Sequence, residues 1–146
     1  MSWQDLEDGN AELATFGRER FTSRVAYLAT VRKDGSPRVH PVTPIIGEGR
    51  LFLFMEPTSP KGFDLRRDPR YAMHASVEDA GGGGGEFFIN GRATLIEDPE
   101  TRDIAGQAAS YAPAGRYILF ELSVISAFSN IYSEEGPPRQ QRWRRD

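Results

Sequence analysis

Short apolar runs separated by turn residues occupy most of the chain, and this pattern restricts it to a mainly β fold. Residues 25–46 form a β-branched and aromatic run, a turn at Asp34-Gly35 and a second run, which together predict a hairpin. Further strands are predicted over residues 50–56, 71–77, 86–97 and 116–128, with a last strand toward Trp143. Six or seven short strands at this spacing are typical of a barrel or a sandwich.

Three helices are predicted beside these strands. An N-terminal helix is expected over about residues 3–21, with Ser2 as its cap and acidic side chains in its first turn. Two short peripheral helices begin where a capping side chain precedes a proline, at Ser59-Pro60 and at Asp98-Pro99. We therefore expect one domain over residues 1–146, with a barrel over about 24–132 and a basic tail over 136–146.

Composition excludes several kinds of chemistry and partner. The 146 residues include no cysteine, which removes thiolate metal sites, disulfide exchange and cysteine nucleophiles. The formal net charge of −3 does not favour nucleic-acid binding, which normally requires a basic domain. No apolar run is long enough for a membrane span, and the start MSWQDLEDGNAE lacks the basic region of a signal peptide. We expect a cytoplasmic protein that binds neither nucleic acid nor a membrane.

The segment FMEPTSPKGFDLRRDP, residues 54–69, carries the strongest chemical signal. A buried strand ends here, hydroxyl residues and a proline start a helix, and Lys61 stands in the first turn of that helix. Free N–H groups, the positive end of the helix dipole and a lysine together suit a phosphate monoester. The alternative is ordinary capping, in which Ser59 accepts a hydrogen bond from its own helix and Lys61 is solvated.

The strand before this segment supplies a second candidate for anion binding. In PRVHPVTP, the residues Arg38, His40 and Val42 share one face of the strand. Pro41 and Pro44 cannot donate to a neighbouring strand, so this strand is expected to be an edge, bulged, or open to a ligand. The forked donors of Arg38 could bind phosphate, although a solvated strand arginine is the alternative.

Metal and triad chemistry find little support in the sequence. His40 and His74 lie on different predicted strands without nearby cysteine or clustered carboxylates, which falls short of a catalytic zinc site. No Gly-x-Ser-x-Gly elbow is present. We expect no metal site and identify no catalytic acid, base or nucleophile.

The order of these segments resembles the pyridoxamine 5′-phosphate oxidase-like family of FMN-binding split barrels. The resemblance covers about residues 20–130 and rests on VAYLATVRKDGSPRVHPVTPI, RLFLFME, TSPKGFDLRRDPRYAMH and FFINGRATL. It implies a Greek-key split β-barrel and a homodimer with FMN in the groove between the subunits.

The resemblance also implies which residues contact the cofactor. The strand Arg38–Val42 resembles the one that passes the isoalloxazine and sends an arginine to the phosphate, while Ser59 and Lys61 resemble the phosphate ligands. Many members have a basic residue where this chain has Pro60. The implied cofactor-binding set is Arg38, Val39, His40, Pro41, Val42, Met55, Glu56, Ser59, Lys61 and, as a C-terminal aromatic reaching the partner's flavin, Trp143.

The implied function is an FMN-dependent oxidoreductase acting on an unidentified small molecule. Two alternatives stay open at this point. The first is a deazaflavin-dependent reductase of the same fold, whose anionic cofactor tail the arginine-rich C-terminus could bind. The second is a non-catalytic flavin- or haem-binding module, with His40 or His74 as the haem ligand. The ending QQRWRRD does not reproduce the Arg-Leu-x-Pro ending that helps pyridoxamine phosphate oxidases to hold their substrate.

Overall fold

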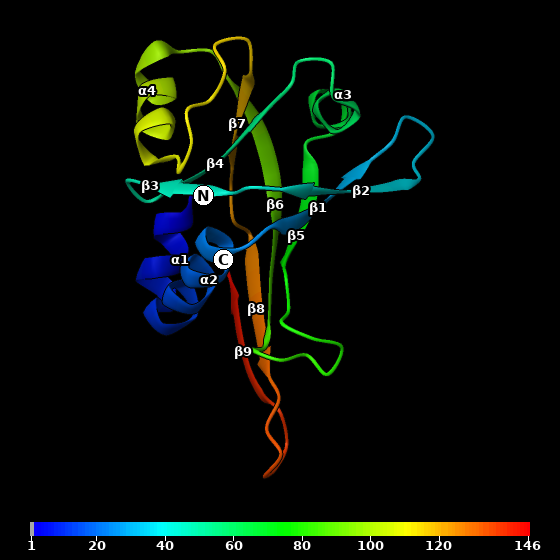
Figure 1. The fold of residues 1–146 in the computed structure, drawn as a ribbon, viewed down its shortest axis with the longest axis vertical. Helices are drawn as coiled ribbons and strands as arrows, with labels where there is room; N and C mark the ends of the chain where they lie inside the picture. The colour runs from blue at the N-terminus through cyan, green and yellow to red at the C-terminus, as the bar shows by residue number, and fades with distance from the viewer. Residues whose placement is uncertain (1) are drawn as a thin grey trace.

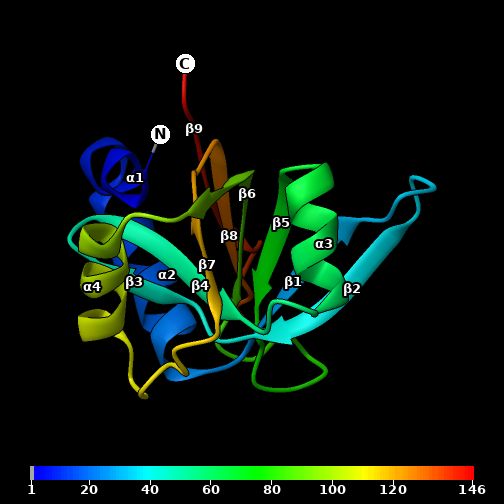
Figure 2. The ribbon, with the colours of Figure 1, turned by 90° about the horizontal axis from the view of Figure 1, so that it is seen from above.

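The structure, a computed structural model, describes residues 2–146 and consists of a curled antiparallel sheet with helices at its sides (Figures 1 and 2). The helices are α1 (Trp3–Gly9), α2 (Ala11–Ser23), α3 (Pro60–Arg67) and α4 (Pro99–Ala108). The strands are β1 (Ala26–Val31), β2 (Pro37–Val42), β3 (Ile45–Gly47), β4 (Arg50–Met55), β5 (Arg70–Ala75), β6 (Glu86–Ile96), β7 (Ile118–Leu122), β8 (Ser126–Ile131) and β9 (Arg139–Arg144).

The long strand β6 joins the two parts of the sheet. Its first half pairs with β5 and β8, and its second half pairs with β7, so that the strand order is β2-β1-β5-β6-β7-β4-β3 with β8 and β9 branching from β6. The change of partner occurs around Gly91, where an added Cβ would overlap the backbone carbonyl of Ser123. Glycine at this position therefore allows the sheet to curl, and the predicted mainly β split barrel is confirmed.

Nine strands are found within residues 2–146 instead of six or seven. The predicted run over residues 25–46 contains an additional break at Thr43-Pro44, where the proline cannot donate to the ladder. The predicted run over residues 116–128 divides into β7 and β8 at residues 123–125, next to Gly91. The expected last strand toward Trp143 is present as β9.

The N-terminal region forms two helices and not the single helix predicted over residues 3–21. Asn10 separates α1 from α2 because its backbone is extended, with φ −156°. Its side chain accepts a hydrogen bond of 3.1 Å from the Leu13 N–H and so caps α2. The other two predicted helices begin as expected, with Ser59 and Asp98 as their N-caps.

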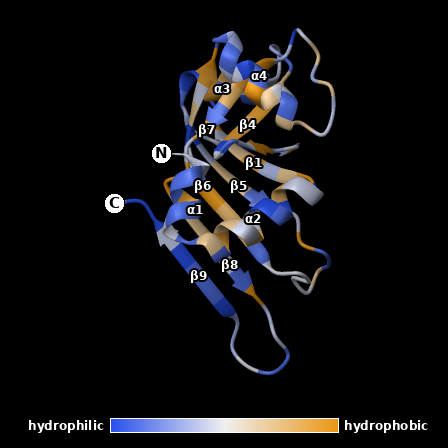
Figure 3. Ribbon diagram, turned by 90° about the vertical axis from the view of Figure 1, so that its left-hand side faces the viewer, coloured by the Kyte–Doolittle hydropathy of each residue, from blue (hydrophilic) through white to orange (hydrophobic). Residues whose placement is uncertain are grey.

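The two N-terminal helices lie over the sheet (Figure 3), and an aromatic cluster packs them against it. Trp3, Phe21 and Phe87 are fully buried, and the rings of Phe21 and Phe87 lie 5.1 Å apart in an edge-to-face arrangement. Gly17 of α2 faces the Phe87 ring, where an added Cβ would overlap it. This cluster fixes the positions of α1 and α2 on the sheet. Separately, none of the helices within residues 2–146 is long and apolar enough to cross a membrane.

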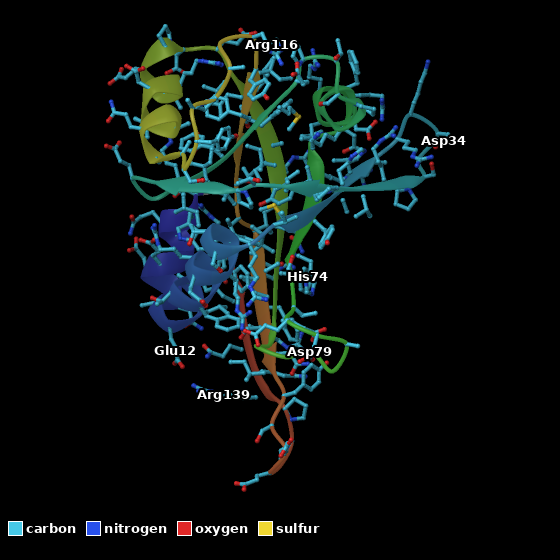
Figure 4. The ribbon with its side chains drawn as sticks, in the orientation of Figure 1. Glu12, Asp34, His74, Asp79, Arg116 and Arg139 are labelled. Atoms are coloured by element: carbon cyan, nitrogen blue, oxygen red, sulfur yellow. The ribbon has the colours of Figure 1, made fainter. Side chains whose placement is uncertain are left out.

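The basic C-terminal segment returns to the acidic N-terminal helices as the edge strand β9. Arg139 pairs with Glu12 at 2.7 Å, and these two side chains lie close together in Figure 4. Arg145 pairs with Asp5 at 2.7 Å. Both pairs are exposed, so each contributes at most about 1 kcal/mol, and the half-buried Trp143 packed against Gly9 is the stronger attachment.

Candidate functional site

A basic groove lies between the β1–β2 hairpin and α3, which stand next to each other in Figure 2. Its volume is about 750 Å³, and the labelled Asp34 marks the hairpin end of it in Figure 4. Four cationic and two acidic side chains face it, together with a threonine, a proline and an exposed phenylalanine. The lining residues are Arg32, Lys33, Asp34, Arg38, Thr58, Pro60, Phe63, Asp64 and Arg67.

Ser59 begins α3 at one end of this groove and serves as the N-cap of the helix. Its Oγ accepts a hydrogen bond of 3.3 Å from the Gly62 N–H. The capping interpretation of the sequence is therefore confirmed for this residue. A hydroxyl that accepts one bond still has its own hydrogen to donate, so capping and anion binding by Ser59 are compatible.

Lys61, in the first turn of α3, is partly buried without a counter-ion. It has no hydrogen bond or ion pair within residues 2–146, and burial lowers the pKa of its ammonium group. His40 on β2 senses the same charge. Burial is the main cause that lowers the pKa of His40, followed by the positive charges of Lys61 and Arg38. Arg38 is paired with Asp64, but the charge of Lys61 lacks a balancing anion among residues 2–146, which fits a phosphate group.

Arg38 projects from β2 toward α3 and is held by a buried carboxylate. Its Nε donates a 2.7 Å hydrogen bond to Asp64 Oδ2, and its two Nη nitrogens have no partner within residues 2–146. The side chain of Asp64 is 4% exposed and also accepts from Thr30 at 2.7 Å and from Arg67 at 3.2 Å. Arg38 is therefore an oriented donor with two free nitrogens and not a freely solvated arginine.

The ionisation of Asp64 reflects a competition between burial and hydrogen bonding. Burial alone would raise the pKa of this carboxyl group, but the donors Arg38, Thr30 and Arg67 outweigh burial and lower the pKa below its ordinary value. Sequence reasoning found Arg38 but missed Asp64, Thr30 and Arg67. The one available signal was the spacing of Pro60, Asp64 and Arg67, which puts them on a single face of the helix.

The other predicted cofactor-binding residues occupy different surroundings. Val42 and Met55 are buried in the main core, and Met55 lies beneath the first turn of α3 near Gly62. Val39 and Pro41 are exposed on the opposite face of β2 from Arg38. At the end of β4, the carboxylate of Glu56 accepts a 2.9 Å hydrogen bond from Arg116 Nε.

Trp143 lies apart from this group within one subunit. Five strand-to-strand steps separate β9 from β2, which corresponds to about 24 Å. Its contact with the flavin of a second subunit stays a prediction.

His40 and His74 project from opposite faces of the sheet because His40 pairs with the buried Leu28, whereas His74 pairs with the exposed Tyr27. The two histidines therefore cannot bind the same metal ion, and no cluster of three potential ligands exists within residues 2–146.

The curled sheet and its branching strands define a split β-barrel protein. A sequence profile described as pyridoxamine 5′-phosphate oxidase matches residues 12–129. The chain belongs to this family, which confirms the resemblance found in its sequence. No curated protein sequence matches the chain significantly.

Solved structures share the fold at low sequence identity. A NimC/NimA family protein from Clostridium acetobutylicum is 18% identical with a TM-score of 0.68, over 95% of this chain and 98% of the other. A heme binding protein from Mycobacterium smegmatis is 20% identical with a TM-score of 0.66, over 88% and 57%. PhzG from Burkholderia lata 383, in complex with tetrahydrophenazine-1-carboxylic acid, is 17% identical with a TM-score of 0.66, over 93% and 84%. These similarities establish the fold.

Proposed function

We propose that the protein binds FMN through its 5′-phosphate and acts as an oxidoreductase on a small molecule. The observation that carries this proposal is the partly buried Lys61, which has no counter-ion among residues 2–146 and stands in the first turn of α3, the helix whose Asp64 holds Arg38. A phosphate dianion between these groups would accept hydrogen bonds from both and from the Ser59 hydroxyl.

The remaining predicted residues then meet the rest of the cofactor. The backbone of residues 38–42 would run along the ring edge, with Met55 and Glu56 on the facing strand end. Bound FMN would supply the redox chemistry at its ring, and the chain would hold it, orient it and limit its access to water. Among the described residues that line the groove, no side chain is positioned as an obvious general acid or base.

We further propose that the functional unit is a homodimer. The sheet face opposite the core exposes apolar side chains, with Tyr27 48% and Val39 63% exposed. On the same face the rings of His74 and Phe88 stack 6.3 Å apart, and Phe88 lies 5.8 Å from Phe128. An apolar surface of this kind is typical of an interface, and we propose that a second copy covers it.

The test is a fluorescence titration of FMN with the purified protein. We expect a dissociation constant below about 100 µM, which corresponds to about −5.5 kcal/mol. Lys61→Gln should weaken binding at least about tenfold because it removes a charge next to the phosphate. Lys33→Gln is the matched control, since the exposed Lys33 lies at the hairpin end of the groove. Binding weaker than about 100 µM by the unchanged protein would contradict the proposal.

A deazaflavin is the second candidate cofactor, and the groove favours it in one respect. In addition to the proposed phosphate ligands Arg38, Ser59 and Lys61, the structure offers Arg32, Lys33 and Arg67, which line the groove and could bind an anionic tail. Two of the C-terminal arginines, Arg139 and Arg145, are instead paired with N-terminal acids. If a deazaflavin with a lactyl-glutamyl tail is the cofactor, Lys33→Gln should weaken its binding in a salt-dependent way and leave FMN binding unchanged.

A non-catalytic module would be recognised by a bound cofactor that is not reduced by the usual electron donors. Cofactor that stays oxidised in the presence of NADPH, NADH or reduced deazaflavin would favour a binding or storage role. An absorbance spectrum of the purified protein would separate flavin from haem, for which His40 and His74 could each serve only singly, from opposite faces of the sheet.

A further inference from the structure

Asp64 is a buried ionised side chain for which the proposed phosphate contacts provide no direct role. It lies on α3, yet it accepts hydrogen bonds from three elements: Thr30 on β1, Arg38 on β2 and Arg67 on α3 itself. A carboxylate that is only 4% exposed is costly to keep charged unless its oxygens are bonded, and all three bonds are present. The question is what this arrangement accomplishes in the groove.

The geometry at Arg38 gives an answer. Oδ2 of Asp64 binds Arg38 through Nε, on the inner edge of the guanidinium group, at 2.7 Å. This leaves the two Nη nitrogens, which are the forked donors suited to a phosphate, without a partner within residues 2–146. Thr30 donates to the same oxygen at 2.7 Å and thereby fixes the carboxylate that fixes the arginine.

We infer that Asp64 is a positioning residue that presents Arg38 to an anionic ligand, an inference that rests on the proposed binding of FMN phosphate. A free arginine side chain samples many rotamers, and ordering it on binding weakens the affinity. Asp64 orders Arg38 before the ligand arrives. Asp64 lines the groove, but its carboxylate is only 4% exposed and pairs with both Arg38 and Arg67, which largely compensate its negative charge.

The test compares FMN with riboflavin, which lacks the phosphate. Asp64→Asn keeps the size of the side chain and should weaken FMN binding about tenfold, because Arg38 loses its charged partner. Riboflavin binding should change less than about twofold. Asp68→Asn is the matched control, because Asp68 is also paired with an arginine, Arg70, but lies at the other end of α3 and does not line the groove.

A double-mutant cycle with Arg38→Gln separates positioning from general support of the fold. If Asp64 acts through Arg38, the double variant should bind FMN within about twofold of Arg38→Gln alone. Additive losses, or an equal loss of FMN and riboflavin binding, would overturn the inference, as would an Asp64→Asn variant that binds FMN like the unchanged protein. If Asp64→Asn does not fold, Thr30→Val replaces it in the cycle with the same expected pattern and a smaller loss. Failure of the unchanged protein to bind FMN would contradict the proposed function itself and remove the inference with it.

Discussion

Gly17 illustrates at the scale of one residue how packing overrides local preference. Within a helix a glycine is unfavourable, and by propensity alone alanine would stabilise α2 by about 1 kcal/mol. The buried Phe87 ring, however, occupies the space that a Cβ at Gly17 would need. The close approach of helix and strand therefore requires glycine.

We predict that Gly17→Ala destabilises the protein by about 1–3 kcal/mol, because the Phe87 ring must move within a close-packed aromatic cluster. Gly106→Ala is the matched control, since Gly106 also lies inside a helix, α4, and has open space around its Cα. This control should stabilise by up to about 1 kcal/mol. Urea denaturation of the two variants measures both values, and a stabilised Gly17→Ala variant would show that the helix can move away from β6.

A second prediction at this scale concerns His40 and pH. Burial and the charges of Lys61 and Arg38 lower its pKa below the ordinary 6.5, so the unfolded chain binds a proton at this histidine more readily than the folded protein does. Above pH 6.5 both states are neutral here and His40 has no effect. As pH falls through 6.5 toward the lowered pKa, the free energy of unfolding should therefore decrease.

Denaturation at a series of pH values, compared between the unchanged protein and His40→Gln, isolates this contribution. In addition, FMN should raise the pKa of His40, because a phosphate dianion offsets the two neighbouring cations. The NMR titration of the His40 ring with and without FMN measures that change. A ring pKa that is unchanged by saturating FMN would place the phosphate elsewhere.

At the scale of elements, the start of α3 combines two roles that a single substitution would confuse. Ser59 caps the helix through its Oγ, and by our proposal it also donates to phosphate. Ser59→Ala removes both contacts, whereas Ser59→Asp retains an excellent N-cap and introduces a negative charge where the phosphate would lie. The two variants therefore separate capping from ligand binding.

We predict that Ser59→Ala loses about 1 kcal/mol of stability and binds FMN a few fold more weakly. Ser59→Asp should be as stable as the unchanged protein and bind FMN at least about a hundredfold more weakly, through repulsion between two anions a few ångströms apart. Thermal unfolding and flavin titration of both variants give the comparison. Undiminished FMN binding by Ser59→Asp would leave Ser59 with a capping role alone.

The elements also mark the limit of prediction from sequence. Alternation of apolar residues identified the strands, and a capping residue followed by proline identified the starts of α3 and α4, because both signals are local. The division between β7 and β8 depends on Gly91 meeting Ser123, which lies 32 positions away, so no local pattern could indicate it. In the same way, Lys61 and Ser59 could be found from their spacing, whereas Asp64 acquires its role only when the β1–β2 hairpin meets α3.

At the scale of the whole molecule, the sheet separates two charged regions. The basic groove lies beside the edge strand β2, while the basic residues of β9 lie at the other end of the same part of the sheet, next to the acidic N-terminal helices. The two ends of the chain are consequently close together, as Figure 1 shows and the Asp5–Arg145 pair confirms. Arg139 and Arg145 thus have partners in their own chain, and only a second copy could bring Trp143 to the groove.

By our proposal, a second copy also covers the exposed sheet face. We predict that the protein has twice the chain mass of 16.3 kDa in solution and that Tyr27→Asp reduces this mass to that of one chain, because it places a charge on the apolar face. Tyr111→Asp is the matched control, since Tyr111 is 38% exposed but lies after α4, away from this face. Sedimentation velocity at several concentrations measures the masses, and FMN titration of the same samples tests the shared groove. A Tyr27→Asp monomer that binds FMN as tightly as the dimer would show that one subunit holds the cofactor by itself.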